Sequence, residues 1–294
     1  MTRRQILSLL CLTALWTDGA YAQRIQQPLG RGVVAVQNGS SVTVTWRRLA
    51  QEPETATYNL YVDGQKANAE PLANTNFVTT TSVIPIGSQV SVTMVADGQE
   101  SAPSVPFTME PRDCRNMFMS ILFDQSPLEA SAFSTSYVWP ADLDGDGEMD
   151  YVVNRKNTSD ALDNYVEGYL RTGEHLWTVK LGPNELSCSG QDDMILAYDM
   201  DGDGKSEVVV QTSDGTQFWN PQTDTFGSYV NGSSTGDTDL DGIIDYETQS
   251  ARNAPRYMSV VDGLTGEEKC SVEQTYNEAY NRDNKAALMG DEYN

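Results

Sequence analysis

The chain has 294 residues, and its hydrophobic fraction of 39% is large enough for packed cores in two domains. Its 42 acidic residues outnumber 19 basic ones, which gives a formal net charge of −23. A surface this acidic repels nucleic acids and anionic membranes, so the composition excludes both as expected partners.

The amino terminus has the features of a secretory signal. Two arginines precede a short apolar run, Ile6–Trp16, and the A-x-A sequence Ala20–Ala22 fits a cleavage site before Gln23. About eleven apolar residues are too few to span a membrane. We therefore expect residues 1–22 to be a signal peptide and the mature protein to be secreted, periplasmic or at the cell surface, with no membrane span.

Residues 23–112 are typical of a small β domain. Two expected strands in Val33–Trp46 flank an Asn-Gly turn, which is a strong hairpin signal. Further strands are expected at 58–62, 77–81 and 90–96. This spacing favours an immunoglobulin-like or fibronectin-like sandwich with Trp46 and Tyr58 in its core. We interpret the domain as a spacer or docking module; sugar binding through an exposed aromatic residue is the alternative.

Three cysteines follow the expected cleavage site: Cys114, Cys188 and Cys270. The odd count allows at most one intramolecular disulfide, and the spacing fits no zinc motif. The pairing stays open, and three buried thiols are an equally good interpretation.

Beyond a proline-rich linker, one acidic pattern occurs three times, with carboxylates at positions 1, 3, 5 and 9 and a glycine at position 6. Alternate carboxylates on a tight turn supply the oxygen ligands that Ca²⁺ prefers, and the backbone carbonyl of position 7 adds one more. The predicted ligands are Asp142, Asp144, Asp146, Glu148 and Asp150 in the first loop, Asp199, Asp201, Asp203, Lys205 and Glu207 in the second, and Asp237, Asp239, Asp241, Ile243 and Asp245 in the third. The alternative is three solvated acidic turns.

These loops differ from helix–loop–helix calcium sites, which close with a Glu at position 12. The first two lead instead into the β-type runs Tyr151–Val153 and Val208–Val210, so we expect loops that end in strands. The third loop departs from the others at Leu240, which replaces the glycine at position 4.

A longer repeat contains these loops. Each of the first two is followed by a strand and then by a hairpin on Thr-Gly-Glu, at Thr172–Glu174 and Thr265–Glu267. Four-stranded units of about fifty residues are typical of β-propeller blades, so residues 113–294 are predicted to form the first blades of a propeller. Because a closed propeller needs at least about four blades, we expect more blades than this chain contains. The alternative is an open stack with an exposed edge strand.

Several segments together carry a family resemblance: Leu29–Val36, Val44–Arg47, Tyr58–Gly64, the first two acidic loops, Thr212–Gly215 and Tyr257–Lys269. They are similar to the opening domain and first blades of the rhamnogalacturonan lyases of polysaccharide lyase family 11, over nearly all of residues 28–275. The resemblance implies an all-β protein, a sandwich followed by a propeller that has eight blades when complete, with Ca²⁺ in its loops.

The activity that this resemblance implies is β-elimination in the rhamnose–galacturonate backbone of pectin, with the acidic polymer rhamnogalacturonan I as the partner of a monomeric enzyme. It places most catalytic basic groups in later blades, so the catalytic residues are unassigned and this chain alone is expected to be inactive. The rival interpretation is a non-catalytic, calcium-stabilised carbohydrate-binding or adhesion module, because integrin-type propellers carry similar loops.

Four residues are candidates for substrate contact. Arg155 and Lys156, on a loop expected after the first blade's strand, could bind a substrate carboxylate, or could simply form a solvated basic turn. Asn157 and Asp160 are candidates for sugar hydroxyls. His175, the only histidine, lies in a hairpin that we expect to face solvent, so it is not predicted to be catalytic.

Overall fold

The computed structural model describes residues 28–113, 117–159, 164–185, 195–220, 222–223, 225–246 and 254–274. In these ranges the regular elements are β-strands, apart from one 3-10 turn at Pro111–Asp113, and the strand pairs are antiparallel. The predicted all-β class is confirmed. Among the described residues no helix has the length and apolar character that a membrane crossing requires.

Some predictions fall on residues outside these ranges. They are the signal peptide at residues 1–22, Asp160, Cys114 and Cys188. Cys270 is described, and it is an exposed free cysteine, so the interpretation as a buried thiol is wrong for this residue.

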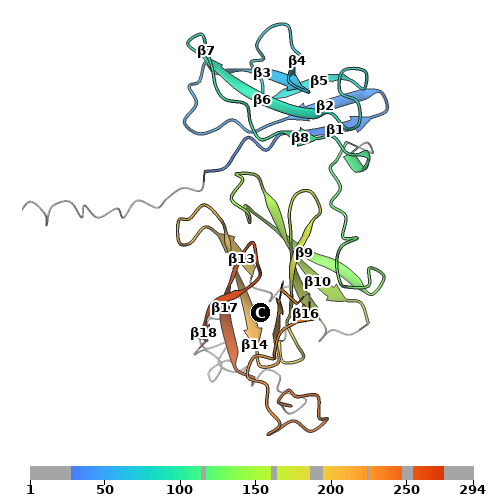
Figure 1. Ribbon diagram of the computed structural model, residues 1–294, viewed down its shortest axis with the longest axis vertical. Coiled ribbons are helices and arrows are strands. Elements are labelled where there is room, and N and C mark those ends of the chain that lie inside the picture. The colour runs from blue at the N-terminus through green and yellow to red at the C-terminus, as the bar shows by residue number, and fades with distance from the viewer. Residues whose placement is uncertain are drawn as a thin grey trace, which may run out of the picture.

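Two sheets form the amino-terminal unit, which lies at one end of the long axis (Figure 1). The first has the order β1-β2-β5, from β1 (Val34–Asn38), β2 (Ser41–Thr45) and β5 (Asn76–Thr80). The second is built on β3 (Thr57–Val62) and β6 (Gln89–Ala96), with β4 (Gln65–Lys66), β7 (Gln99–Glu100) and β8 (Phe107–Thr108). The predicted β1–β2 hairpin is confirmed, and Gly39 takes the left-handed φ of 61° that its turn needs.

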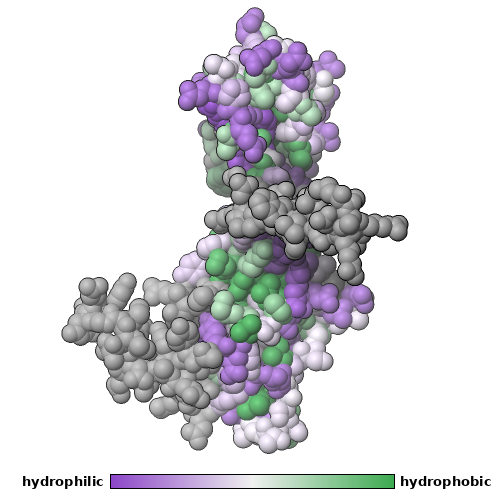
Figure 2. All heavy atoms as spheres, turned by 90° about the vertical axis from the view of Figure 1, so that its left-hand side faces the viewer, coloured by the Kyte–Doolittle hydropathy of each residue, from purple (hydrophilic) through white to green (hydrophobic). Residues whose placement is uncertain are grey.

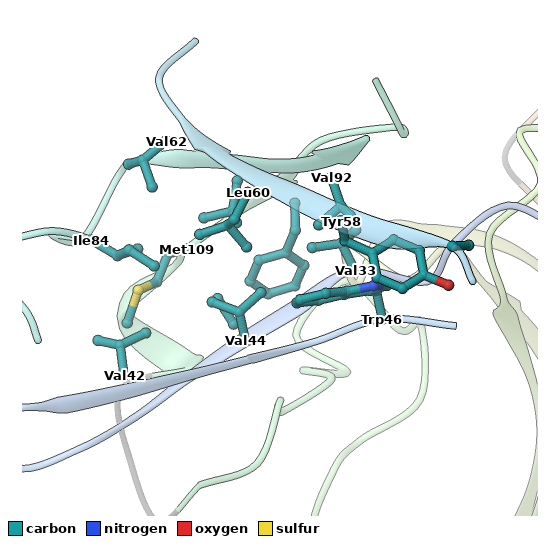
Figure 3. Packing of buried hydrophobic residues seen from close by; sticks show 14 residues of the cluster. Val33, Val42, Val44, Trp46, Tyr58, Leu60, Val62, Ile84, Val92 and Met109 are labelled. Carbon is teal, nitrogen blue, oxygen red and sulfur yellow. The ribbon is translucent and has the colours of Figure 1, made fainter. Parts of the chain in front are cut away.

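One apolar core lies between these two sheets (Figure 3). Alternate residues point inward, as in Val42 and Val44 from β2 and Leu60 from β3, because successive side chains of a strand point to opposite faces. Trp46 and Tyr58 are both buried and meet edge to face, with ring centroids 5.6 Å apart. Their predicted place in the core is confirmed. Burying each such side chain stabilises the fold by about 1.5–3 kcal/mol.

Two further sheets form the second unit at the other end of the molecule (Figure 1). One has the order β16-β15-β12-β11-β10-β9, from β9 (Phe133–Ala141), β10 (Asp150–Asn157), β11 (Asn164–Tyr169), β12 (His175–Lys180), β15 (Gln217–Asn220) and β16 (Thr225–Phe226). The other has the order β13-β14-β17-β18, from β13 (Ile195–Tyr198), β14 (Glu207–Ser213), β17 (Arg256–Asp262) and β18 (Glu268–Glu273). In each sheet an acidic loop joins the first strand to the second, and the prediction that the first two loops lead into strands is confirmed.

A second apolar core joins these two sheets. Val152 and Val166 of the first sheet cluster with Val208 and Val210 of the second. Trp177 belongs to this core, is fully buried, and donates from Nε1 to the carbonyl of Gly263, 2.7 Å away. The two sheets are therefore held together both by apolar contacts and by a buried hydrogen bond.

The two units present different surfaces. On the face drawn in Figure 2, the amino-terminal unit is mostly hydrophilic, whereas apolar residues gather among polar ones on the second unit. The strand β9, at one edge of its sheet, exposes Tyr137, Val138 and Trp139, and the edge strand β18 exposes Val272. The second unit thus leaves apolar sheet edges uncovered within the described residues.

Candidate metal centres

The first acidic loop joins β9 to β10 and gathers three carboxylates. Asp142, Asp144 and Asp146 each offer an oxygen, and these oxygens lie within 4.8 Å of one another. The turn is held from inside, because Asp142 accepts backbone N–H bonds from Gly145 at 2.8 Å and Gly147 at 2.9 Å. The alternation of carboxylates along a tight turn therefore produces the convergent oxygens that the sequence predicted.

Asp150, at position 9, closes this loop. It is buried, and its two carboxylate oxygens accept backbone N–H bonds from Leu143 at 3.0 Å and Arg171 at 2.8 Å. It lies outside the group of three converging carboxylates, so its predicted role as a ligand stays a prediction.

Burial makes the first loop costly to charge. The pKa of Asp142 is raised to about 6, first by burial and then by the neighbouring charges of Asp146 and Asp144. Burial also raises the pKa of Asp150 to about 7. A carboxylate whose ionised form is disfavoured in this way is stabilised by a nearby cation. A bound metal ion would therefore stabilise the ionised carboxylates of this loop.

The second loop repeats the same geometry between β13 and β14. Asp199, Asp201 and Asp203 offer oxygens within 4.8 Å of one another, and Asp199 accepts backbone N–H bonds from Gly202 and Gly204. Glu207, at position 9, accepts an N–H bond from Met200 at 2.9 Å.

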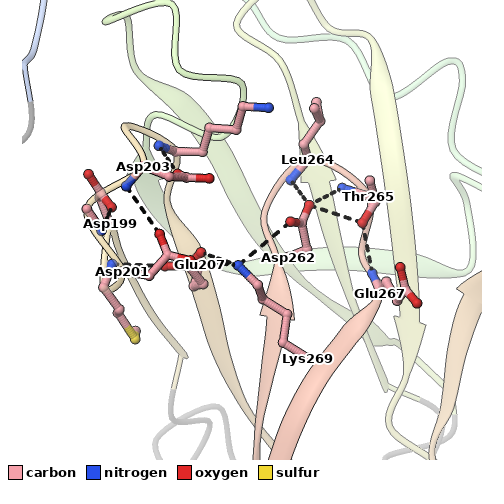
Figure 4. Close-up of polar contacts among 12 residues, drawn as sticks. Asp199, Asp201, Asp203, Glu207, Asp262, Leu264, Thr265, Glu267 and Lys269 are labelled. Atoms are coloured by element: carbon pink, nitrogen blue, oxygen red, sulfur yellow. Dashed lines mark hydrogen bonds and ion pairs between the residues drawn. The ribbon is translucent and has the colours of Figure 1, made fainter.

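A lysine from a distant strand contacts this second loop (Figure 4). Lys269 Nζ lies 2.7 Å from Glu207 Oε1 and 3.1 Å from Asp201 Oδ2. The hydrogen bonds to Glu207 and then Asp201 raise the pKa of Lys269. The second loop therefore already holds one positive charge.

The third loop is the most exposed of the three. Its converging oxygens come from Asp237, Asp239 and Asp245. Leu240, at the position where the other loops have glycine, keeps the same left-handed backbone with a φ of 68°, which is uncommon for a residue with a Cβ. The third loop thus has the backbone of the others in spite of its different sequence.

The converging group of the third loop does not include the residues at positions 5 and 7. Asp241 lies outside the converging group and accepts the backbone N–H of Ile243 at 2.8 Å. The side chain of Ile243 is buried, and its methyl groups lie so close to Gly215 that a Cβ there would clash with them. Ile243 can therefore serve a metal only through its carbonyl, as the sequence predicted.

The donor set of all three loops fits a hard divalent cation. The converging atoms are carboxylate oxygens, and no histidine or cysteine belongs to these groups in the described part of the chain. Calcium takes six to eight oxygen ligands, whereas zinc favours nitrogen and sulfur. The residues present can thus hold a metal ion, and they suit Ca²⁺ better than zinc.

Glu148, at position 7 of the first loop, has a role that the sequence did not reveal. Its carboxylate is 1% exposed and accepts the backbone N–H of Gly32 at 3.0 Å. It also pairs with Arg47 and Arg171, each at 3.2 Å. Arg171 in turn donates to the carbonyl of Val33 at 2.9 Å. The first loop therefore fastens the second unit to the amino-terminal unit.

The prediction that Arg155 lies on a loop is wrong. Residues 154–157 form the second half of β10, because the strand goes on pairing with β11 and β9 past an irregularity between Val153 and Arg155. Arg155 is 3% exposed, pairs with Glu167 at 2.8 Å and lies over the ring of Phe123. Its guanidinium thus has an internal carboxylate partner, and the solvated basic turn is excluded for it.

Lys156 and Asn157 end the same strand and are half-buried. Asn157 accepts hydrogen bonds from the backbone N–H and the hydroxyl of Ser159, both at 2.9 Å. Their contact with substrate stays a prediction, as does that of Asp160, which lies outside the described residues.

The prediction that His175 faces solvent is wrong. Its side chain is 9% exposed, lies 3.8 Å from the buried Glu167, and packs against the ring of Tyr169. Residues before β9 cover this face of the sheet, since Phe123 also packs on Tyr169 and Ser126 donates to Glu167. No sequence pattern indicates this contact, because the covering segment has no regular structure.

Comparison with protein families gives two matches. Residues 24–109 match the rhamnogalacturonan I lyase β-sheet domain, and residues 127–294, more than half of the chain, match the C-terminal domain of rhamnogalacturonan lyase family 11. The two matches correspond to the two units described above.

Known relatives agree with these matches. The chain is 29% identical over 263 residues to rhamnogalacturonan endolyase YesW and 30% identical over 267 residues to rhamnogalacturonan exolyase YesX, both of Bacillus subtilis (strain 168). These alignments cover 84% and 85% of this chain, and 39% and 40% of the relatives. The chain thus spans about 40% of the length of the curated relatives it matches.

Solved structures show the same relationship. The crystal structure of YesW matches with a TM-score of 0.65 and 26% identity, over 86% of this chain and 42% of that one. The rhamnogalacturonan lyase PL11 of Bacillus licheniformis matches with a TM-score of 0.63 and 25% identity, over 90% of this chain and 44% of that one. The resemblance found in the sequence is confirmed, and the chain belongs to rhamnogalacturonan lyase family 11.

Proposed function

We propose that this protein is a secreted, calcium-binding lyase that cleaves the rhamnose–galacturonate backbone of pectin by β-elimination. The observation that carries the proposal is the family membership, because both curated relatives are named as rhamnogalacturonan lyases. Their names differ in endo and exo action, and the proposal does not choose between the two modes.

We also propose a fold for each of the two units. The amino-terminal sheets form an immunoglobulin-like or fibronectin-like sandwich, and the second unit forms the first blades of a propeller. The run of four consecutive antiparallel strands β9 to β12 in the first sheet and the four antiparallel strands of the second support this, as does the contact between β9 and β13. Neighbouring blades, which pack face to face, would cover exposed apolar side chains of β9 and β18.

Calcium in the three loops is the proposed cofactor. Its charge would relieve the repulsion among converging carboxylates, and in the first two loops its ligands would fix the connection between the first and second strands of a sheet. The supporting observation is the set of converging, all-oxygen donor groups in the three loops. We assign these ions a structural role, since the first loop also carries the contact between the two units.

The chemistry of elimination sets what the rest of the site must supply. The proton beside the galacturonate carboxylate is weakly acidic, so a cation must offset that charge while a base removes the proton and an acid assists the leaving oxygen. Lys156 is the better of the two basic candidates, because it is half-buried whereas Arg155 is already paired with Glu167. The base and the acid remain unassigned among the described residues.

The test is an assay of the full-length protein. It is incubated with rhamnogalacturonan I and Ca²⁺, and the ultraviolet absorbance of the unsaturated product is followed. Absorbance should rise with rhamnogalacturonan and stay flat with a neutral arabinan control. The 294-residue chain alone is expected to release no product, because the family resemblance places the catalytic groups in later blades. A flat trace from the complete, folded and calcium-loaded protein would refute the lyase and favour a non-catalytic sugar-binding module.

A further inference from the structure

Lys269 reaches the second acidic loop because of a local irregularity in its strand. In the pairing of β17 with β18, Val260 faces Cys270 and Val261 faces Glu268, so Lys269 is the extra residue of a β-bulge. A bulge redirects the side chain of its extra residue away from the regular alternation. Here the side chain extends toward the start of β14, where Glu207 ends the second loop.

The contacts of Lys269 fall on two predicted calcium ligands. Its ammonium lies 2.7 Å from Glu207 Oε1 and 3.1 Å from Asp201 Oδ2, and Asp262 Oδ2 is 4.0 Å away (Figure 4). Asp201 and Glu207 occupy positions 3 and 9 of the loop. Asp201 belongs to the converging group of this loop, so a calcium ion there would compete with the ammonium for its carboxylate, and the double charge of the ion would repel the ammonium.

The first loop is arranged differently. Among the ion pairs of the described residues, Arg47 and Arg171 both pair with Glu148 of this loop. Glu148 occupies position 7, where the predicted calcium ligand is the backbone carbonyl and not the side chain. The carboxylate at position 9, Asp150, accepts only backbone N–H bonds in the contacts described. Basic side chains thus approach the first loop without occupying the carboxylates that would bind the ion.

We propose that Lys269 is a tethered cation that competes with Ca²⁺ for the second loop and sets its affinity below that of the first. The proposal rests on the calcium binding proposed above. Without calcium, the ammonium partly neutralises the second loop, so this loop depends less on the metal for its shape. With calcium, the ammonium must leave Asp201 and Glu207.

The experiment is a calorimetric calcium titration of the decalcified protein and of three variants. Asp203→Asn removes an exposed carboxylate of the second loop, and the binding step that it weakens is assigned to this loop. Lys269→Met should tighten that step about ten-fold, as expected when one charge-assisted contact no longer has to be broken. Lys205→Met is the matched control, because it removes the same charge from the loop itself and keeps the backbone carbonyl; it measures the general effect of charge.

The outcomes separate this inference from the proposed function. An unchanged or weaker second-loop step in Lys269→Met, with calcium still bound elsewhere, would overturn the competition alone. No calcium binding by the folded wild-type protein would overturn the proposed calcium sites and this inference with them. Should Lys269→Met fold poorly, as judged by circular dichroism, Lys269→Gln removes the charge but keeps a polar side chain and gives the same comparison.

Discussion

The first and third acidic loops share one carboxylate pattern but lie in different surroundings. In the first, Asp142 and Asp150 are buried, and Glu148 is held by groups of the amino-terminal unit. In the third, the carboxylates of Asp239 and Asp245 are exposed. The shared pattern specifies the turn and its oxygens. The surroundings determine how strongly burial disfavours the ionised carboxylates and which other parts of the molecule the loop contacts.

The first loop also contacts the second. The backbone N–H of Ser206 donates to the carbonyl of Asp142 at 2.7 Å, and both residues are buried. The third loop is anchored mainly through the side chain of Ile243 and through Asn184, which donates to the carbonyl of Ile244 at 3.0 Å. We therefore expect changes in the first loop to disturb more of the molecule than changes in the third.

The largest expected effect comes from removing the Glu148 carboxylate. Glu148→Ala should lower the free energy of unfolding by about 3 kcal/mol, because it leaves Arg47 and Arg171 without their buried partner. Urea titration followed by tryptophan fluorescence measures the loss. Glu54→Ala, an exposed glutamate of the amino-terminal unit, is the control and should change stability by less than about 0.5 kcal/mol. Equal effects of the two variants would contradict the fastening role of Glu148.

The second effect concerns pH in the calcium-free protein. Folding raises the pKa of Asp142 to about 6 and that of Asp150 to about 7, from an ordinary value of 3.8. Between the ordinary pKa and the raised pKa values, the folded state binds more protons than the unfolded state. The free energy of unfolding should therefore fall as pH rises from about 4 to about 7. Saturating Ca²⁺ should abolish this fall, because the ion favours the ionised carboxylates.

Melting temperatures of dialysed protein across that range, with and without Ca²⁺, measure this effect. Asp150→Asn is the matched control, and its calcium-free melting temperature should depend less on pH than that of the wild type. The same slope in Asp150→Asn and wild type would show that Asp150 does not carry the dependence.

The smallest effect lies in the third loop. Leu240 is 85% exposed and has a φ of 68°, so its side chain contributes strain and little packing. Leu240→Gly should stabilise the protein by about 0.5 kcal/mol, since relief of the left-handed strain slightly exceeds the entropy that glycine adds to the unfolded chain. Leu240→Ala keeps the Cβ and should give no gain in the same thermal unfolding assay. A loss of stability in Leu240→Gly would mean that the exposed leucine makes contacts of its own.

Local patterns predicted the features that depend on neighbouring residues. The converging carboxylates of the loops, the β1–β2 hairpin and the burial of Trp46 and Tyr58 all follow from spacing within a few residues. The Asp-x-Asp pattern in particular determines both the turn and the position of its oxygens.

Other features depend on contacts that are distant in the chain. Glu148 meets Arg47 from about a hundred residues away, and Lys269 reaches Glu207 only because β18 is bulged. Arg155 looked like part of a basic turn, but Glu167 on the neighbouring strand neutralises it and lets β10 continue. No local pattern reports such partners, because strand register and bulges decide which side chains meet.

The central claim is that the three acidic loops bind calcium, and crystallography of the protein with Ca²⁺ tests it most directly. Data collected at a wavelength where calcium scatters anomalously should show a peak inside each carboxylate cluster. The peak among Asp142, Asp144 and Asp146 should be the strongest, and the one beside Lys269 should be weaker. A first loop without a peak, in crystals where the other loops hold the ion, would contradict the claim.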